Sequence, residues 1–423
     1  MEKKILKSII VRQQELVCNV DFIERPLTIE ATVNYVLVGL RRAGKTYMLY
    51  QTIRHLLNEG HKKEEILFVN FEDERINGIC KEELHEILEA YGELYDTKPI
   101  VFLDEVQNID GWEHFARRLA DEKYKVFVTG SNAYMLSREI ASTLGGRYQI
   151  REIYPFSFME YLKWHGVVID KTWEYGSARQ TVRRMFDDYI CYGGISEVFP
   201  LKDKRGWLTT LYQKVLYSDV VMRNRIRNDK ALSLLVKKLA DSVLQPTSVK
   251  RLQDMLTGIG EKVTRETVTA FLKYLHDAYL TFSLANYSDG IKEREGTRKH
   301  YFYDNGILNL FLFQPEAKLL ENIVALSLVR KYGEDEVFYY RRNVEVDFVV
   351  PRQSLAIQVA YDLELSSTKS RETASLAGLC KYMDNISNPL IITMETEDTI
   401  YADDVKIEVI PVWKWLIEIS NVS

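Results

Sequence analysis

The stretch NYVLVGLRRAGKTYMLY, from Asn34 to Tyr50, constrains the fold of this chain more than any other. Its apolar run, Tyr35–Val38, predicts a buried strand. A helix is predicted from Thr46 onward, because apolar residues recur there every three or four positions: Met48, Leu49, Ile53, Leu56 and Leu57. Between strand and helix, four residues separate Gly39 from the triplet Gly44-Lys45-Thr46, which is the spacing of a phosphate-binding loop.

In such a loop, backbone N–H groups and the positive end of the helix surround the nucleotide phosphates. We expect Lys45 to neutralise the β- and γ-phosphate oxygens of ATP and the Thr46 hydroxyl to bind Mg²⁺. A side chain at Gly39 or Gly44 would crowd the phosphates. The alternative is an ordinary glycine-containing turn before a helix. The predicted ATP-binding residues are Gly39, Leu40, Arg41, Arg42, Ala43, Gly44, Lys45, Thr46 and Tyr47.

A second acidic element follows about sixty residues later, where the apolar run Ile100–Leu103 leads directly into Asp104 and Glu105. A carboxylate at the carboxyl end of a central parallel strand is placed to hold Mg²⁺, and we assign that role to Asp104. Glu105 is the expected general base for the attacking water, with Gln107 nearby. An acidic turn after a core strand is the alternative, but two consecutive acids favour hydrolysis over binding alone.

Two further candidates lie downstream of these acids. The run KVFVTGSNAY predicts a strand beside that of Asp104, and it ends in Ser131 and Asn132. These side chains either contact the attacking water or γ-phosphate, or form a turn that caps the next helix. Arg147 precedes one more strand, and it either stabilises transition-state charge, in cis or across a subunit contact, or is a solvated surface residue.

Composition excludes several other classes of protein. With 423 residues, 46% of them hydrophobic, the chain can build two to four domains, and its net charge of -5 indicates no general attraction to nucleic acid or membrane. The four cysteines form no CxxC pair and the seven histidines have no ligand spacing, which argues for a reducing compartment without a zinc module. No apolar run reaches membrane-spanning length and no cleavable leader is apparent, so we expect a soluble, cytoplasmic protein.

The segments GLRRAGKT, VFLDEVQ, TGSNAY and LGGRYQIREIYPFSFMEYL together resemble the AAA-type ATPases of prokaryotes that carry a C-terminal domain of unknown function. The resemblance continues through YGGISEVF, LYSDVVMRNRIRN, KHYFYDNGILNL, LLENIVALSLVRKYG, VEVDFVV and IQVAYDL, over nearly the whole chain. It implies an α/β fold: an AAA-type P-loop NTPase with a parallel sheet, a helical lid, a winged helix and a C-terminal restriction-endonuclease-like α/β domain. In that family the arginine matching Arg147 is thought to face the nucleotide.

On this basis we expect four domains. Residues 1–155 form the P-loop ATPase domain with a leading helix, residues 156–230 a helical lid or linker, residues 231–312 a winged-helix-like domain, and residues 313–423 the restriction-endonuclease-like domain. Helices over Thr247–Leu256 and Thr264–Asp277 and strands over Tyr279–Asn286 and Lys299–Tyr303 suit the winged helix.

The region 202–251 is basic, with twelve Lys or Arg residues against four Asp, in a chain that is acidic overall. It is either a footprint for phosphate contacts or a salt-bridged face between domains. Its most concentrated basic residues are Arg223, Arg225, Arg227 and Lys230. In a winged helix, Arg265, Lys273 and Arg298 would face double-stranded DNA, although such modules also dock proteins.

The terminal domain carries a possible degenerate metal site. A metal-dependent nuclease of the restriction-endonuclease type holds Mg²⁺ with a helix acid, a strand aspartate and an acid or glutamine on the next strand, and a lysine two residues further polarises water. Glu321, Asp347 and Gln358 match these ligands, but Ala360 stands at the lysine position. Lys369 or Lys381 of the following helix is a candidate replacement. The alternatives are an inactive fold kept for binding or assembly, and an Asp347 that belongs to a buried polar network. Strand-like runs from Asn388 to Leu416 close the domain.

Together these features predict an ATPase that binds and hydrolyses Mg-ATP and couples it to conformational change, with double-stranded DNA as a candidate partner. Glu105, Lys45, Arg147 and Ser131 are the predicted catalytic residues. The alternatives are a slow nucleotide-dependent switch that controls assembly, for example of a homo-oligomer, and an ATP-regulated nuclease.

Overall fold

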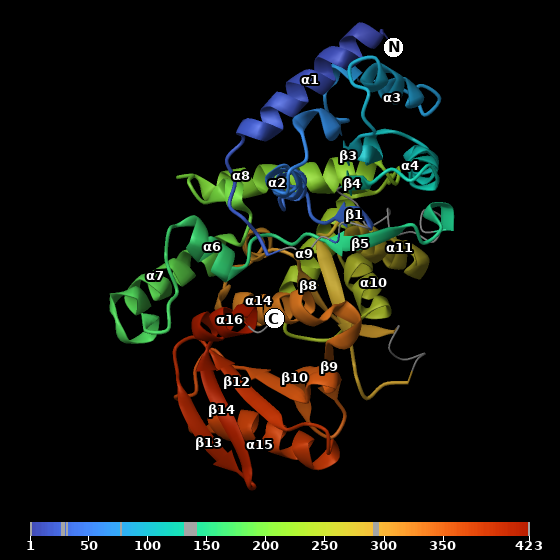
Figure 1. Ribbon diagram of the computed structural model, residues 1–423. Helices are drawn as coiled ribbons and strands as arrows, with labels where there is room; N and C mark the ends of the chain where they lie inside the picture. Colours follow the sequence, from blue (N-terminus) through green and yellow to red (C-terminus); the bar gives the residue numbers. More distant parts are fainter. Residues whose placement is uncertain are drawn as a thin grey trace. The chain divides into compact units, whose positions relative to one another are not determined.

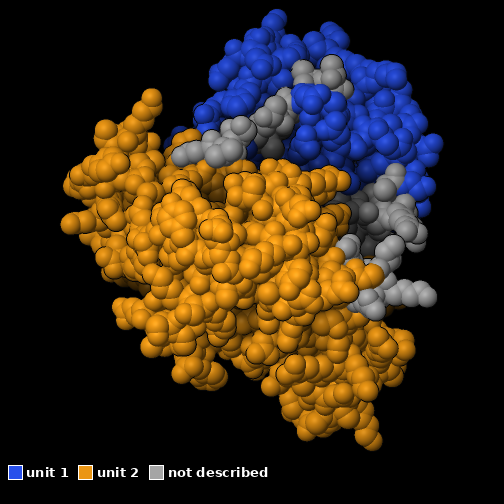
Figure 2. Space-filling model, turned by 90° about the horizontal axis from the view of Figure 1, so that it is seen from below, with its two compact units in different colours: residues 1–154, 277–279 blue, residues 155–276, 280–423 orange. Residues whose placement is uncertain are grey.

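The computed structural model in Figure 1 describes residues 2–26, 30, 33–76, 78–130, 142–290 and 296–421. The chain forms two compact units, one of residues 1–154 with 277–279 and one of residues 155–276 with 280–423 (Figure 2). No described helix is both long enough and apolar enough to cross a membrane. The predicted division into four domains stays a prediction.

The first unit is built on a parallel five-stranded sheet with the strand order β2-β3-β4-β1-β5. The central strands are apolar and buried along most of their length, as is typical of parallel sheets, whereas the edge strand β5 is largely exposed. The strands are β1 (Asn34–Val38), β2 (Ile66–Asn70), β3 (Ile100–Asp104), β4 (Val126–Gly130) and β5 (Tyr148–Glu152). The helices are α1 (Lys3–Asn19), α2 (Lys45–Asn58), α3 (His85–Gly92) and α4 (Trp112–Asp121). The predicted parallel sheet is confirmed.

The leading helix α1 is joined to this sheet by two buried glutamines. Gln14 Nε2 donates to the carbonyl oxygen of Ile66 at 2.7 Å, and the Asn70 N–H donates to Gln13 Oε1 at 3.3 Å. Both contacts reach β2, one at each end of the strand. The helix therefore packs on the nucleotide unit, as its amphipathic pattern indicates.

The parallel register sets which residues can meet. Val38 pairs with Gly130 and Glu152, and Asn70 pairs with Asp104, so the carboxyl ends of all five strands lie along one edge of the sheet. The glycine loop after β1 begins at the same edge. Residues that precede the strands lie at the opposite edge.

The second unit begins with helices and a small antiparallel sheet of strand order β6-β8-β7. Its strands are β6 (Thr247–Ser248), β7 (Thr281–Ala285) and β8 (Thr297–Phe302). The helices up to and including this part are α6 (Phe158–Trp164), α7 (Ser177–Tyr192), α8 (Lys204–Lys214), a π-helix (Val215–Met222), α9 (Asp229–Asp241), α10 (Val249–Gly258) and α11 (Arg265–Asp277). Two helices followed by a hairpin agree with the sequence pattern, and the winged-helix identity stays a prediction.

The C-terminal part of this unit contains a mixed six-stranded sheet of order β13-β14-β12-β11-β10-β9, with α15 against it (Figure 1). Its strands are β9 (Phe338–Arg341), β10 (Glu345–Val350), β11 (Leu355–Val359), β12 (Asn388–Thr393), β13 (Asp398–Ala402) and β14 (Val405–Pro411). The helices are α13 (Asn305–Asn309), α14 (Glu316–Tyr332), α15 (Ser366–Tyr382) and α16 (Val412–Asn421). The core between α15 and the sheet includes Val346, Ala356, Leu376, Leu379 and Ile391.

The end of the chain differs from the strand-like tail expected to continue to Leu416. Residues 412–421 form α16. Trp413, Leu416 and Ile417 are all buried, and their spacing by three and four residues suits one face of a helix.

Candidate functional site

The glycine loop connects β1 to α2. Glycine is required at its two positions, 39 and 44, for different structural reasons. Gly39 has φ +149°, and a Cβ there would lie 2.1 Å from the carbonyl oxygen of Ile153. The Ile153 N–H donates to the Val38 carbonyl at 2.7 Å, so Gly39 is required where the loop meets the segment after β5. Gly44 caps α2 in the left-handed region, with φ +94°. The expectation that phosphate crowding explains both glycines is therefore incomplete.

Lys45 is buried beneath this loop. Its Nζ donates to the carbonyl oxygens of Gly39 and Leu40, both at 3.1 Å, and its side chain curls back toward the start of the loop. The ammonium group therefore lies within the loop, where a phosphate-binding cation is needed.

Arg25 supports the loop from the connector after α1. Its Nη1 donates to the Ala43 carbonyl at 2.9 Å and its Nη2 to the Tyr154 carbonyl at 2.9 Å. The backbone of Arg25 is in turn held by both ends of the Gln51 amide, at 2.9 and 2.8 Å. This role of Arg25 was not predicted from the sequence, because a single arginine beside a proline matches no motif.

The remaining loop residues differ in their surroundings. Leu40 and Ala43 are buried and form the inner side of the loop, while Tyr47 is 48% exposed. Arg41 Nη2 pairs with Glu72 Oε1 at 2.8 Å, and Arg42 has a positive φ of 68°. The loop is therefore anchored on its inner side and presents polar groups on its outer side.

Asp104 lies at the carboxyl edge of the sheet, within hydrogen-bond distance of the start of α2. The Thr46 hydroxyl is 3.0 Å from Oδ2 and 3.2 Å from Oδ1 of Asp104. Thr129, at the end of β4, donates its hydroxyl to Oδ1 of the same carboxylate. The pKa of Asp104 is raised to about 7, chiefly by burial and also by the neighbouring charge of Glu105. Hard oxygen donors gathered in this way suit Mg²⁺.

Glu105 leaves the strand in a left-handed conformation, with φ +55°. Its N–H donates to the Thr129 hydroxyl at 3.0 Å, and its carboxylate accepts a hydrogen bond from the Gln107 side chain. A positive φ in a residue other than glycine is uncommon and is held in place by its surroundings. Thr129 thus contacts both acids, although the sequence-based prediction named Ser131, two positions later, and not Thr129. Its place at the end of a strand next to that of Asp104 was the available signal.

Of the other predicted residues, only Arg147 is described, and it does not join this group. Ser131 lies outside the described residues, as does Asn132. Arg147 precedes β5, so it lies at the amino edge of the sheet, and it donates to Asp121 there. The strands are five residues long, about 16 Å at roughly 3.3 Å per residue, which separates Arg147 from the loop of its own chain. A role for Arg147 in trans stays a prediction.

The basic residues singled out in the second unit lie at its surface. Arg223, Arg225, Arg227, Arg265 and Lys273 are exposed. Lys230 is also exposed and pairs with Glu261 at 2.6 Å, while Arg298 donates to the Ser283 hydroxyl at 3.4 Å. Apart from Arg298, which is half-buried, these side chains are exposed.

In the C-terminal part of the chain, two of the three predicted metal ligands lie close together. Glu321 on α14 and Asp347 on β10 approach a common point, which is occupied by the side chain of Lys299. Lys369 pairs instead with Asp398 and Lys381 with Asp403, both at exposed positions. Neither candidate replacement lysine reaches the acids.

Comparisons with known proteins match two separate parts of the chain. Residues 32–162 match the family described as AAA domain, and residues 183–318 match a domain of unknown function (DUF8612). Uncharacterized protein MJ1544 of Methanocaldococcus jannaschii is 33% identical over 431 residues, covering 98% of this chain and 96% of the relative. An uncharacterized protein of Haemophilus influenzae is 28% identical over 395 residues, covering 90% and 94%. Among solved structures, the Walker-type ATPase PABY2304 of Pyrococcus abyssi has a TM-score of 0.41 at 15% identity, covering 66% of this chain and 90% of that one.

Proposed function

Since this chain belongs to the family of AAA-domain proteins that includes MJ1544 of M. jannaschii, we propose that it binds Mg-ATP and hydrolyses it. Its first unit has the parallel sheet and phosphate loop of the P-loop ATPases. The observation that supports the proposal best is the contact between the Thr46 hydroxyl and the buried carboxylate of Asp104, at the edge of the sheet where the loop begins.

The glycine loop is the proposed binding site of the nucleotide phosphates. Backbone N–H groups at the start of a helix lack partners within the helix and can bind an anion, and the helix dipole favours negative charge there. Lys45, which bonds two loop carbonyls, would turn its ammonium to the β- and γ-phosphate oxygens. Arg25 holds the loop in shape from beneath by its bond to Ala43.

Thr46 and Asp104 are the residues that would hold Mg²⁺ with the nucleotide, because their oxygens already lie together. When bound, the metal neutralises charge on the β- and γ-phosphates. Thr129 keeps the Asp104 carboxylate in position by donating to one of its oxygens.

Glu105 is the proposed general base. Its backbone is fixed by Thr129 and its carboxylate by Gln107, which orients an acceptor for the proton of the attacking water. Ser131, in the segment after β4, is retained as a candidate for contact with the γ-phosphate.

We propose that the conformational change coupled to ATP hydrolysis acts on double-stranded DNA. The support is the group of exposed basic side chains in the second unit, Arg223, Arg225, Arg227, Arg265 and Lys273, within a chain of net charge -5. A local excess of exposed arginine and lysine is the pattern of phosphate contacts, which weaken steeply with salt.

The test is ATP turnover of the wild type, Lys45→Ala and Glu105→Gln, each with and without duplex DNA, together with ATP binding. We expect Glu105→Gln to bind ATP without turning it over and Lys45→Ala to bind ATP more weakly than the wild type. DNA should accelerate the wild type at low salt only. Wild-type turnover by Glu105→Gln would refute the assigned base. Negligible turnover by the wild type, with an ATP-dependent change in oligomeric state, would instead identify a nucleotide-dependent switch.

A further inference from the structure

Lys299 is a buried lysine in the middle of β8. Its side chain is only 1% exposed, and the strand around it, TRKHYF, buries His300, Tyr301 and Phe302 as well. A buried ammonium group is costly unless it is paired and hydrogen-bonded. The chain must therefore supply anionic partners at this point.

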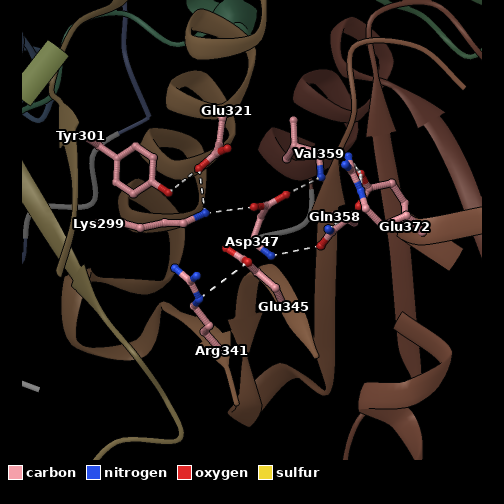
Figure 3. Close-up of polar contacts among 10 residues, drawn as sticks. Lys299, Tyr301, Glu321, Arg341, Glu345, Asp347, Gln358, Val359 and Glu372 are labelled. Atoms are coloured by element: carbon pink, nitrogen blue, oxygen red, sulfur yellow. Dashed lines mark hydrogen bonds and ion pairs between the residues drawn. The ribbon is translucent and has the colours of Figure 1, made fainter. Parts of the chain in front are cut away.

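Two carboxylates from different elements provide that pairing (Figure 3). Lys299 Nζ lies 3.1 Å from Oε1 of Glu321 on α14 and 2.9 Å from Oδ1 of Asp347 on β10. The Tyr301 hydroxyl donates to the same oxygen of Glu321 at 2.7 Å. These acids are two of the three residues that match the metal ligands of a restriction-endonuclease-like domain.

The third expected ligand, Gln358, does not complete a metal site. Its Oε1 accepts the backbone N–H of Asp347 at 3.1 Å, and its Nε2 donates to Glu372, away from Lys299 (Figure 3). The other oxygen of Asp347 accepts the Val359 N–H at 3.0 Å. Across the described ranges, no group of three or more His, Cys, Asp or Glu side chains is arranged to hold a metal ion. The residues present therefore do not fit a resident divalent cation.

We propose that the Lys299 ammonium occupies the place of a divalent cation between Glu321 and Asp347, so that the native site is filled by the chain itself and takes no metal. One positive charge faces two carboxylates here, whereas a divalent ion would balance both.

This assignment has a consequence for the function of the C-terminal part. Lys299 comes from the three-stranded sheet, and its partners come from α14 and from the six-stranded sheet, so the ammonium joins three separate elements. The cluster contributes to holding these elements together and leaves no position for a metal-bound water. Removing the ammonium alone should expose a site of two carboxylates that accepts one divalent cation.

The experiment measures Mn²⁺ binding to the nucleotide-free full chain by electron paramagnetic resonance. We compare the wild type, Asp347→Asn, Lys299→Met and the double variant Lys299→Met with Asp347→Asn. We expect equal Mn²⁺ binding by the wild type and Asp347→Asn, one additional site in Lys299→Met, and loss of that site in the double variant. Any weak Mn²⁺ binding near Thr46 is the same in all four proteins, so it does not affect the differences between them.

Two results would overturn the proposal. One is an Mn²⁺ site of the wild type that disappears in Asp347→Asn. The other is a Lys299→Met protein with wild-type circular dichroism that gains no site. If Lys299→Met does not fold, the wild type and Glu321→Gln form a second pair: equal Mn²⁺ binding supports the proposal, and loss in the variant contradicts it.

Discussion

The Thr46 hydroxyl lies 3.0 Å from the carboxylate of Asp104, although 58 positions separate the two residues in the sequence. The contact depends on the sheet order, which sets β3 two strands from β1 with their carboxyl ends on the same edge. It gives the proposed Mg²⁺ site two oxygen ligands from two elements, so each can be tested by itself.

Thr46→Ala should raise the Mg²⁺ concentration needed for half-maximal ATP turnover by about tenfold or more, because one metal ligand and one hydrogen bond to a carboxylate are lost. Thr46→Ser keeps the hydroxyl and should stay close to wild type. Titrating Mg²⁺ at fixed ATP distinguishes the two variants. An unchanged Mg²⁺ requirement in Thr46→Ala would remove Thr46 from the proposed site.

Lys45→Ala should weaken ATP binding by about tenfold to hundredfold, since a charge-assisted contact to phosphate is lost in a buried loop. Calorimetric titration with a non-hydrolysable ATP analogue measures this effect without turnover. Lys62→Ala is the matched control, because Lys62 is an exposed lysine in the connection after α2. If both variants bound equally well, the loop would not be the nucleotide site.

Gly39→Ala should destabilise the first unit strongly, by about 3 kcal/mol or more, because its Cβ would overlap the Ile153 carbonyl oxygen at 2.1 Å. Gly92→Ala is a suitable control, since a Cβ there meets nothing within 4 Å and the residue ends α3. Denaturant unfolding of both variants tests the prediction. Similar stability of the two would show that the loop and the segment after β5 separate easily.

The order and type of the elements in the first unit could be predicted from local patterns. Buried parallel strands are continuous apolar runs, and Asp104 follows one of them, so the strand, loop and acid were all visible in the sequence. The position of Arg147 could also be predicted, because a residue that precedes a parallel strand lies at the amino edge of the sheet.

The partners of buried charges could not be predicted in the same way. Lys299 meets Glu321 and Asp347, which lie 22 and 48 positions further on, and nothing in their spacing specifies this contact. The sequence shows only a lysine within an aromatic strand. Similarly, Arg25 and Thr129 gain their roles from neighbours brought by the fold. Local periodicity determines secondary structure, whereas these contacts depend on how the elements pack.

His300, beside Lys299 on β8, should make the small sheet sensitive to acid. The pKa of His300 is lowered from 6.5 to about 4, chiefly by burial and also by the charge of Arg298, while Glu334 acts in the opposite direction. The folded state therefore resists protonation, and the unfolded state binds the proton first. This contribution to stability is complete above pH 6.5 and is lost as the pH falls toward 4, by about 3 kcal/mol at 1.36 kcal/mol per unit.

Hydrogen exchange of the β7 and β8 amides, corrected for the intrinsic rate at each pH, measures this loss directly. Between pH 6.5 and 4 we expect protection of these strands to fall about a hundredfold further in the wild type than in His300→Gln, which cannot take up a proton. His114→Gln is the control, because the His114 side chain is 69% exposed and lies on α4, outside the small sheet. Parallel loss of protection in the wild type and His300→Gln would show that His300 is protonated without opening the sheet.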